Sequence, residues 1–183
     1  MPARYLGPWR FDVTVREGVV APVTVAALLR VAARALSAAG APAPASLGLI
    51  LSDDVELASL NAAHMGKPGP TDVLSFPLHP PTVFPEHPRG AALDPGAVEP
   101  GPAFVLPPGA RAHLGDIVIS VARAVEQAEM GRGGWTSDVR WAPGDELRLL
   151  VAHGVLHVCG WDHAEPVEEA AMRALERSLL ESA

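Results

Sequence analysis

The chain has 183 residues, of which 49% are hydrophobic, and this length suits a single domain, residues 1–183, with a hydrophobic core. No run approaches the roughly 18 apolar residues of a membrane span, and a single cysteine excludes an internal disulfide, so we expect a soluble cytoplasmic protein without membrane contact. The formal net charge of −7 argues against a strongly basic nucleic-acid binder, because lysine and arginine make most phosphate contacts.

The first third of the chain predicts two strands and two helices. Apolar and polar residues alternate over residues 9–16, which is the two-residue period of a half-buried strand. Residues 22–39 have apolar side chains at helical spacing, and Gly40 is placed to end that helix. Residues 47–51 form a short apolar run typical of a strand, and Asp53 after it occupies the position of a helix N-cap.

The middle of the chain predicts two strands separated by a long irregular segment. Residues 71–76 are rich in side chains that suit a pleated sheet. Residues 79–112 contain many prolines and glycines, so we expect a loop insertion at the sheet edge, either a surface loop or a lid or partner contact. Residues 114–120 have the composition of a buried central strand, and a helix ending at Gly131 follows.

The last part of the chain predicts two helices around a histidine-rich motif. Asp145 is placed to cap a helix whose apolar residues fill the core. Pro166 suits the first turn of a final helix, whose apolar stripe includes Val167 and Leu179. Together these elements predict an α+β fold, with a small mixed four-stranded sheet, packed helices and a metal site on a central helix.

Three histidines form the candidate metal site. His153 and His157 are four residues apart, so on a helix they project from one face. Gly160 suits the left-handed residue that ends a helix, which allows the chain to reverse and to bring His163 back as a third ligand. Three nitrogen ligands with a fourth position left for water are typical of catalytic zinc, although imidazole also suits copper, iron or nickel. The alternative is that all three are ordinary core or surface histidines.

The residues between the histidines limit the chemistry. Metzincin proteases have the same ligand spacing, but they carry a glutamate as general base where this chain has Gly154. A glycine there is expected to let a substrate backbone approach the metal closely. Cys159 lies off the two-histidine face and is predicted to pack in the core. Asp162 is expected either to orient a ligand ring or to cap the helix that follows.

The motif His153-Gly154-x-Leu156-His157-x-x-Gly160-x-Asp162-His163 resembles the signature of the YbeY family of bacterial endoribonucleases and rRNA maturation factors. Residues 60–77 and 114–120 agree with the family in order and spacing, and the resemblance covers roughly residues 45–180 apart from the insertion. It implies a YbeY-like fold and a zinc-dependent, single-strand-specific endoribonuclease that acts in 16S rRNA 3′-end maturation and ribosome quality control. It also implies one Zn²⁺ per chain on His153, His157 and His163, with the metal-bound water as the catalytic group. The implied partners are rRNA, the small ribosomal subunit and assembly factors, without DNA.

Further site residues follow from the same resemblance. In the family the loop and strand before the insertion flank the metal, so Asp72 and Ser75 are expected to line the substrate site, with turn capping and strand packing as the alternative roles. The chain departs from the family pattern at Met65, where members usually carry an arginine thought to matter for RNA cleavage. A thioether cannot hold a phosphate. Either another group does this work, with Lys67, His64 and Arg111 as the possibilities, or the nuclease activity is weak.

Two other classes of function stay open at this point. One alternative is a non-catalytic ribosome-assembly factor in which the metal staples the fold, and Gly154 and Met65 both favour it. The other alternative is a different metallohydrolase or a protease. The chain has the ligand spacing of these enzymes but lacks their glutamate.

Overall fold

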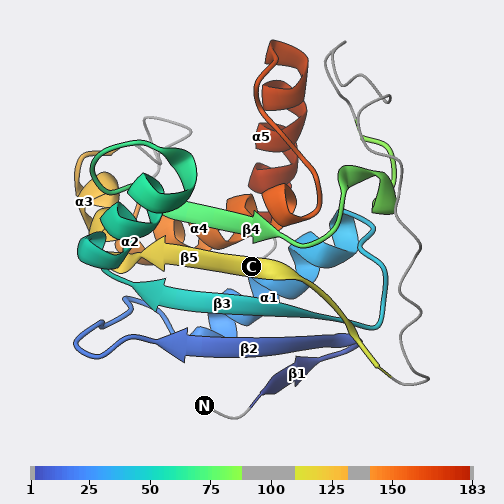
Figure 1. Cartoon of the computed structure of the whole chain (residues 1–183), viewed down its shortest axis with the longest axis horizontal. Helices are drawn as coiled ribbons and strands as arrows, with labels where there is room; N and C mark the ends of the chain where they lie inside the picture. Colours follow the sequence, from blue (N-terminus) through green and yellow to red (C-terminus); the bar gives the residue numbers. More distant parts are fainter. Residues whose placement is uncertain (1–2, 88–109, 132–140, 182–183) are drawn as a thin grey trace.

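The computed structural model describes residues 3–87, 110–131 and 141–181 (Figure 1). Its centre is a mixed five-stranded sheet with the strand order β1-β2-β3-β5-β4. The strands are β1 (Arg4–Leu6), β2 (Trp9–Val15), β3 (Ala45–Ser52), β4 (Val73–Pro77) and β5 (Ala112–Ser120). Strands β2, β3 and β5 are parallel, and the two edge strands run antiparallel to their neighbours.

The sheet has one strand more than the sequence predicts. The extra strand, β1, has three residues, which are too few to show an alternating pattern, and it pairs with β2 across a tight turn. Gly7 in that turn has a φ of 57°, in the left-handed region that glycine adopts at little steric cost. The prediction of a mixed sheet with packed helices is therefore confirmed, and the prediction of four strands is wrong.

The described residues form five α-helices and two short turns of helix. They are α1 (Val25–Ala38), α2 (Asp54–Leu60), α3 (Val121–Glu129), α4 (Pro143–Val158) and α5 (Pro166–Glu181), with the π-helical turn η1 (Asn61–Met65) and the 3-10 turn η2 (Pro81–Val83). The side chain of Asp53 accepts hydrogen bonds from two N–H groups in the first turn of α2, which confirms the predicted N-cap. Asp145 caps α4 from inside the helix, because it accepts from the N–H of Ala142. In the described part of the chain, no helix combines the length and the apolar composition that crossing a membrane requires.

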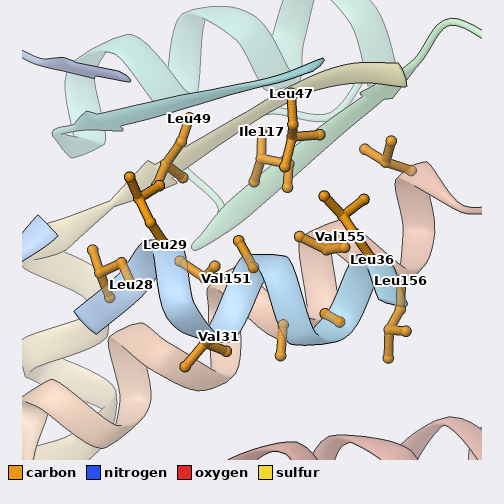
Figure 2. Close-up of a cluster of buried hydrophobic side chains, with 14 of the residues drawn as sticks. Leu28, Leu29, Val31, Leu36, Leu47, Leu49, Ile117, Val151, Val155 and Leu156 are labelled. Carbon is orange, nitrogen blue, oxygen red and sulfur yellow. The ribbon is translucent and has the colours of Figure 1, made fainter. Parts of the chain in front are cut away.

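One face of the sheet carries the main hydrophobic core. Side chains of α1, α4 and the sheet meet there, as Figure 2 shows for Leu28, Leu29, Leu36, Leu47, Leu49, Ile117, Val151 and Val155. The opposite face is covered at one end by α2, whose Leu57 packs against Leu74 and Val118. Burying each side chain of this kind contributes roughly 1.5–3 kcal/mol, so the core holds α4 firmly against the sheet.

Helix α4 lies at the centre of the helical layer. It contacts α1, α3, α5, β4 and β5, and ten of its sixteen residues are buried. A helix packed on so many sides has little freedom to shift, because a displacement would open cavities in a close-packed interior. Side chains at the edge of α4, among them the half-buried His153 and His157, are therefore held in fixed positions relative to the sheet.

The predicted loop insertion at residues 79–112 lies mostly outside the described residues, which exclude residues 88–109. In its described part, η2 follows β4, and Phe84 is buried in the main core. The N–H of Leu78 donates to the carbonyl of Leu114 at 3.0 Å, so the pairing of β4 with β5 extends to the start of the insertion.

Cys159 provides a test of this core. It is buried in the main cluster, as its helical phase predicts, and burial raises the pKa of its thiol to about 12. We predict that the folded protein does not react with Ellman's reagent at pH 8, because access is blocked and the thiolate fraction falls about a thousandfold. Absorbance of the released chromophore measures the reaction, and protein unfolded in urea is the positive control. Rapid labelling of the folded protein would contradict the burial of Cys159.

Candidate metal centre

Three histidine side chains converge at the end of α4. The Nε2 atoms of His153 and His157 are 3.0 Å apart, and the two rings meet edge to face. The ring of His163 lies 5.4 Å from that of His153 and 5.0 Å from that of His157, measured between centroids. One nitrogen from each histidine lies within 4.8 Å of the other two. The structure thus brings together all three residues of the predicted ligand set.

The chain reversal after α4 positions the third histidine. Gly160 has a φ of 82°, and its N–H donates to the carbonyl of His157 at 3.0 Å, which confirms the predicted helix end. In the loop that follows, Oδ1 of Asp162 accepts from the backbone N–H of His163 at 2.8 Å. This contact matches neither predicted role of Asp162, because it involves no ligand ring and lies before α5, which begins at Pro166. Asp162 instead shapes the loop that carries the third histidine.

These residues fit a zinc ion. Tetrahedral zinc about 2.0–2.1 Å from each imidazole nitrogen places the nitrogens roughly 3.3 Å apart, close to the 3.0 Å between His153 and His157. Burial, and then the neighbouring His153 and His163, lower the pKa of His157 to about 4, so its ring is neutral at pH 7 and keeps a lone pair for a metal. His163 is exposed, so packing does not explain its approach to the other two. Its position favours a metal site over ordinary core or surface histidines.

A buried carboxylate contacts the first ligand. Glu176 of α5 is 4% exposed, and its Oε1 lies 2.8 Å from Nδ1 of His153. The buried residues of α5 are Glu168, Met172, Glu176 and Leu179. The predicted apolar stripe of α5 is therefore correct at Leu179, which is buried in the core, and wrong at Val167, which is 63% exposed. In the sequence, Glu168 and Glu176 stand at helical spacing with the apolar residues Met172 and Leu179. This spacing was the available signal that glutamates lie on the buried face of the helix.

Gly154 faces the sheet rather than the metal. A Cβ atom at this position would lie 2.7 Å from Cγ2 of Ile117 and 3.3 Å from Oγ of Ser75. The hydroxyl of Ser75 also donates to the carbonyl of Gly154 at 3.2 Å. These contacts do not test the expectation that Gly154 lets a substrate approach the metal, which stays a prediction. The observed role of Gly154 is to let α4 approach β4 and β5 closely.

A cavity of about 630 Å³ opens beside the histidines. It is lined by the loop before β4, by β4 itself and by the three ligands, namely Asn61, Met65, Lys67, Pro68, Pro70, Thr71, Asp72, Val73, Leu74, Ser75, Pro77, His153, His157 and His163. The sequence-predicted residues Lys67, Asp72 and Ser75 thus lie at the cavity. Among its described lining residues, Lys67 is the one lysine or arginine.

The side chain of Asp72 is occupied by hydrogen bonds. Its Oδ1 accepts from the hydroxyl of Thr71 at 3.1 Å and from the N–H of Val73 at 2.9 Å. Its Oδ2 accepts from the side-chain amide of Gln127 on α3 at 3.0 Å. A carboxylate held by donors on both oxygens is poorly placed to take a proton from a substrate. Asp72 thus lines the cavity and at the same time ties the start of β4 to α3.

The other predicted site residues lie apart from the cavity lining. The ring of His64 packs edge-on against Phe76, with centroids 5.2 Å apart. Arg111 donates to the carbonyl of Pro8 and lies 5.7 Å from the ring centre of Tyr5, beside β1 and β2. The structure therefore does not bring Arg111 to the histidines. Its local partners at the far side of the sheet explain its position.

Known proteins resemble this chain over most of its length. A family model described as Endoribonuclease YbeY matches residues 19–183. A curated protein named Endoribonuclease YbeY from Salinispora tropica is 42% identical over 163 residues, which cover 88% of this chain and 89% of that protein. One of the same name from Mycobacterium sp. (strain KMS) is 42% identical over 141 residues, which cover 75% of this chain but 63% of that protein, less than two thirds.

One solved structure shares the fold. The solution structure of TM1509 from Thermotoga maritima is 20% identical to this chain, with a TM-score of 0.50. The match covers 93% of this chain and 87% of that one. At this identity the likeness concerns the arrangement of helices and strands alone.

The role of Gly154 can be tested by Gly154→Ala. We predict a loss of about 1–3 kcal/mol in the free energy of unfolding, because the added methyl group overpacks the contact with Ile117. Alanine is the better helix former by about 1 kcal/mol, so propensity alone predicts the opposite sign. Urea unfolding measures the difference. In an Ile117→Ala background the same substitution should cost less, and a stabilised single variant would contradict the close approach.

Proposed function

The chain belongs to the YbeY endoribonuclease family, and we propose that it is a zinc-dependent, single-strand-specific endoribonuclease that acts in 16S rRNA 3′-end maturation and ribosome quality control. The observation that carries this proposal is the convergence of His153, His157 and His163 beside a cavity large enough for part of an RNA chain. Three neutral nitrogen ligands leave a position of a tetrahedral metal free for substrate or water, as in catalytic rather than structural zinc sites.

The proposal extends to the setting in which the enzyme works. We propose that residues 1–183 act as a single cytoplasmic domain that binds single-stranded rRNA together with the small ribosomal subunit and its assembly factors, and that it does not act on DNA. The formal net charge of −7 favours local rather than overall electrostatic attraction of RNA. Lys67 at the cavity is the side chain best placed to contact a phosphate.

Different residues of the site have different proposed roles. When bound, a zinc ion supplies a Lewis acid that lowers the pKa of water to about 7 and stabilises negative charge on a phosphate. His153, His157 and His163 would hold the ion beside the cavity, and residues of β4 line the cavity in which a substrate would bind. Asp72 has both carboxylate oxygens hydrogen-bonded, so it is not a free base. Position 154, where the zinc proteases carry their glutamate base, is a glycine without a side chain. Among its described lining residues, the cavity therefore offers no free side-chain carboxylate as a general base.

A second candidate is a non-catalytic ribosome-assembly factor in which the metal stabilises the fold. The observation that favours it is Met65, which lines the cavity at the position where family members usually carry an arginine, and which is 47% exposed. Chelation distinguishes the two functions, because a structural metal contributes to folding outright. Loss of cooperative unfolding on chelation would favour the assembly factor, and an intact fold with lost cleavage would favour the enzyme. A third candidate is a metallohydrolase of the protease type. This chain has the ligand spacing of those enzymes but lacks their glutamate base.

The main test is cleavage of a labelled single-stranded RNA by protein of known zinc content. We predict that His157→Ala lowers the rate by at least about 100-fold, because it removes a ligand on which the metal chemistry depends. A DNA oligonucleotide of the same sequence should stay intact, and circular dichroism confirms that the variant is folded. Equal cleavage by the variant and the wild type would contradict a catalytic metal. A wild type that does not cleave RNA would favour the assembly factor over the enzyme.

Met65, which lines the cavity at the position where family members usually carry an arginine, gives a separate prediction. Met65→Arg should raise the rate of RNA cleavage by about tenfold or more, because a guanidinium can bind a phosphate and stabilise charge that develops in the transition state. Met65→Leu is the matched control, since it preserves size without adding charge. Single-turnover kinetics on the same RNA measure both variants. An unchanged rate for the arginine variant would show that position 65 does not limit cleavage.

A further inference from the structure

Glu176 occupies a core position on α5. The helix packs on α4 through a buried stripe in which Met172 and Leu179 are apolar, and Glu176 lies between them in helical phase. Its side chain is 4% exposed. Burying a carboxylate costs free energy unless a partner compensates for the lost hydration. A glutamate at this position therefore calls for a specific partner, and a leucine there would pack without that cost.

The partner of Glu176 is the first histidine of the metal site. Oε1 of Glu176 lies 2.8 Å from Nδ1 of His153. An ionised carboxylate only accepts hydrogen bonds, so this contact with an ionised Glu176 requires the proton of the ring on Nδ1 of His153. The neutral ring then has its lone pair on Nε2, and that is the atom 3.0 Å from Nε2 of His157. The hydrogen bond thus fixes both the tautomer and the orientation of the ring toward the other ligands.

The contact also places a negative charge beside an otherwise neutral set of ligands. In the described part of the chain, His153 is the one ligand of the three whose ring is hydrogen-bonded to a carboxylate. A carboxylate behind a ligating imidazole increases the basicity of the ring and compensates the charge of a bound cation. Glu176 is 23 residues from His153 in sequence, so the docking of α5 on α4 completes the site.

We propose that Glu176 is a positioning residue of the metal centre, which selects the Nδ1-protonated tautomer of His153 and strengthens the binding of zinc. This proposal rests on the proposed function in so far as the three histidines hold the metal. It gives α5 a role in the site besides covering the core.

Two variants on the same helix test the proposal. Glu176→Gln keeps the size of the side chain and removes the charge, and it should weaken zinc binding by about 10–100-fold, the usual effect of losing such a partner. Glu168→Gln is the matched control, because Glu168 is also buried on α5 and accepts from the backbone N–H of Glu165 rather than from a ligand. It should change zinc affinity by less than about threefold, within ordinary scatter. Competition with a chromophoric chelator measures the dissociation constants.

A second measurement does not depend on zinc. Long-range ¹H–¹⁵N correlation spectra of the metal-free protein report which ring nitrogen of His153 is protonated. The wild type should show the Nδ1-protonated form, and Glu176→Leu should shift the population toward the Nε2-protonated form, because the acceptor that favours a proton on Nδ1 is removed. A merely structural role for Glu176 predicts lost stability with an unchanged tautomer.

The outcomes separate this proposal from the proposed function. Zinc affinity unchanged in Glu176→Gln, or lowered equally in Glu168→Gln, would overturn the positioning role. A tautomer of His153 that is the same in Glu176→Leu as in the wild type would overturn it as well. A wild type that binds no zinc would contradict the proposed function instead, and the spectra of the metal-free protein would still decide what Glu176 does to His153.

Discussion

The close packing of α4 on the sheet is the constraint on which the rest of the structure depends. Gly154 allows the helix to approach β4 and β5 at a distance that no larger residue permits. The same helix carries His153 and His157, so the contact that fills the core also fixes two ligands beside the cavity. One glycine substitution therefore affects both stability and the geometry of the site. This coupling explains why a residue that touches no ligand stands inside the ligand motif.

The charges near the site follow a consistent arrangement. Three histidines provide neutral nitrogens, Glu176 provides a buried negative charge behind one of them, and Lys67 provides a positive charge at the cavity wall. A carboxylate thus lies behind one of the candidate ligands, and a lysine lines the cavity beside all three. With a formal net charge of −7 and Lys67 as the one basic residue among the described lining of the cavity, the proposed binding of RNA would depend on local contacts rather than on a strongly basic protein.

The sequence predicted what depends on local spacing and missed what depends on distant contacts. The one-turn spacing of His153 and His157 and the helix end at Gly160 were sufficient to predict the convergence of the ligands. Glu176 was missed because its role arises only when α5 docks on α4. The position of Arg111 depends on its contacts with Tyr5 of the short strand β1 and with the carbonyl of Pro8, and a strand of three residues carries no periodic signal. Tertiary packing, rather than local pattern, decides these features.

In the proposed site, three imidazoles and no other protein group hold one zinc ion. X-ray absorption at the zinc edge of the metal-loaded protein tests this ligand set most directly, because it measures the number and type of the ligands. We predict three imidazole nitrogens at about 2.0–2.1 Å from the zinc and one oxygen ligand from water or buffer. A sulfur ligand at about 2.3 Å, which would require Cys159 to leave the core, or fewer than three imidazoles, would contradict this ligand set.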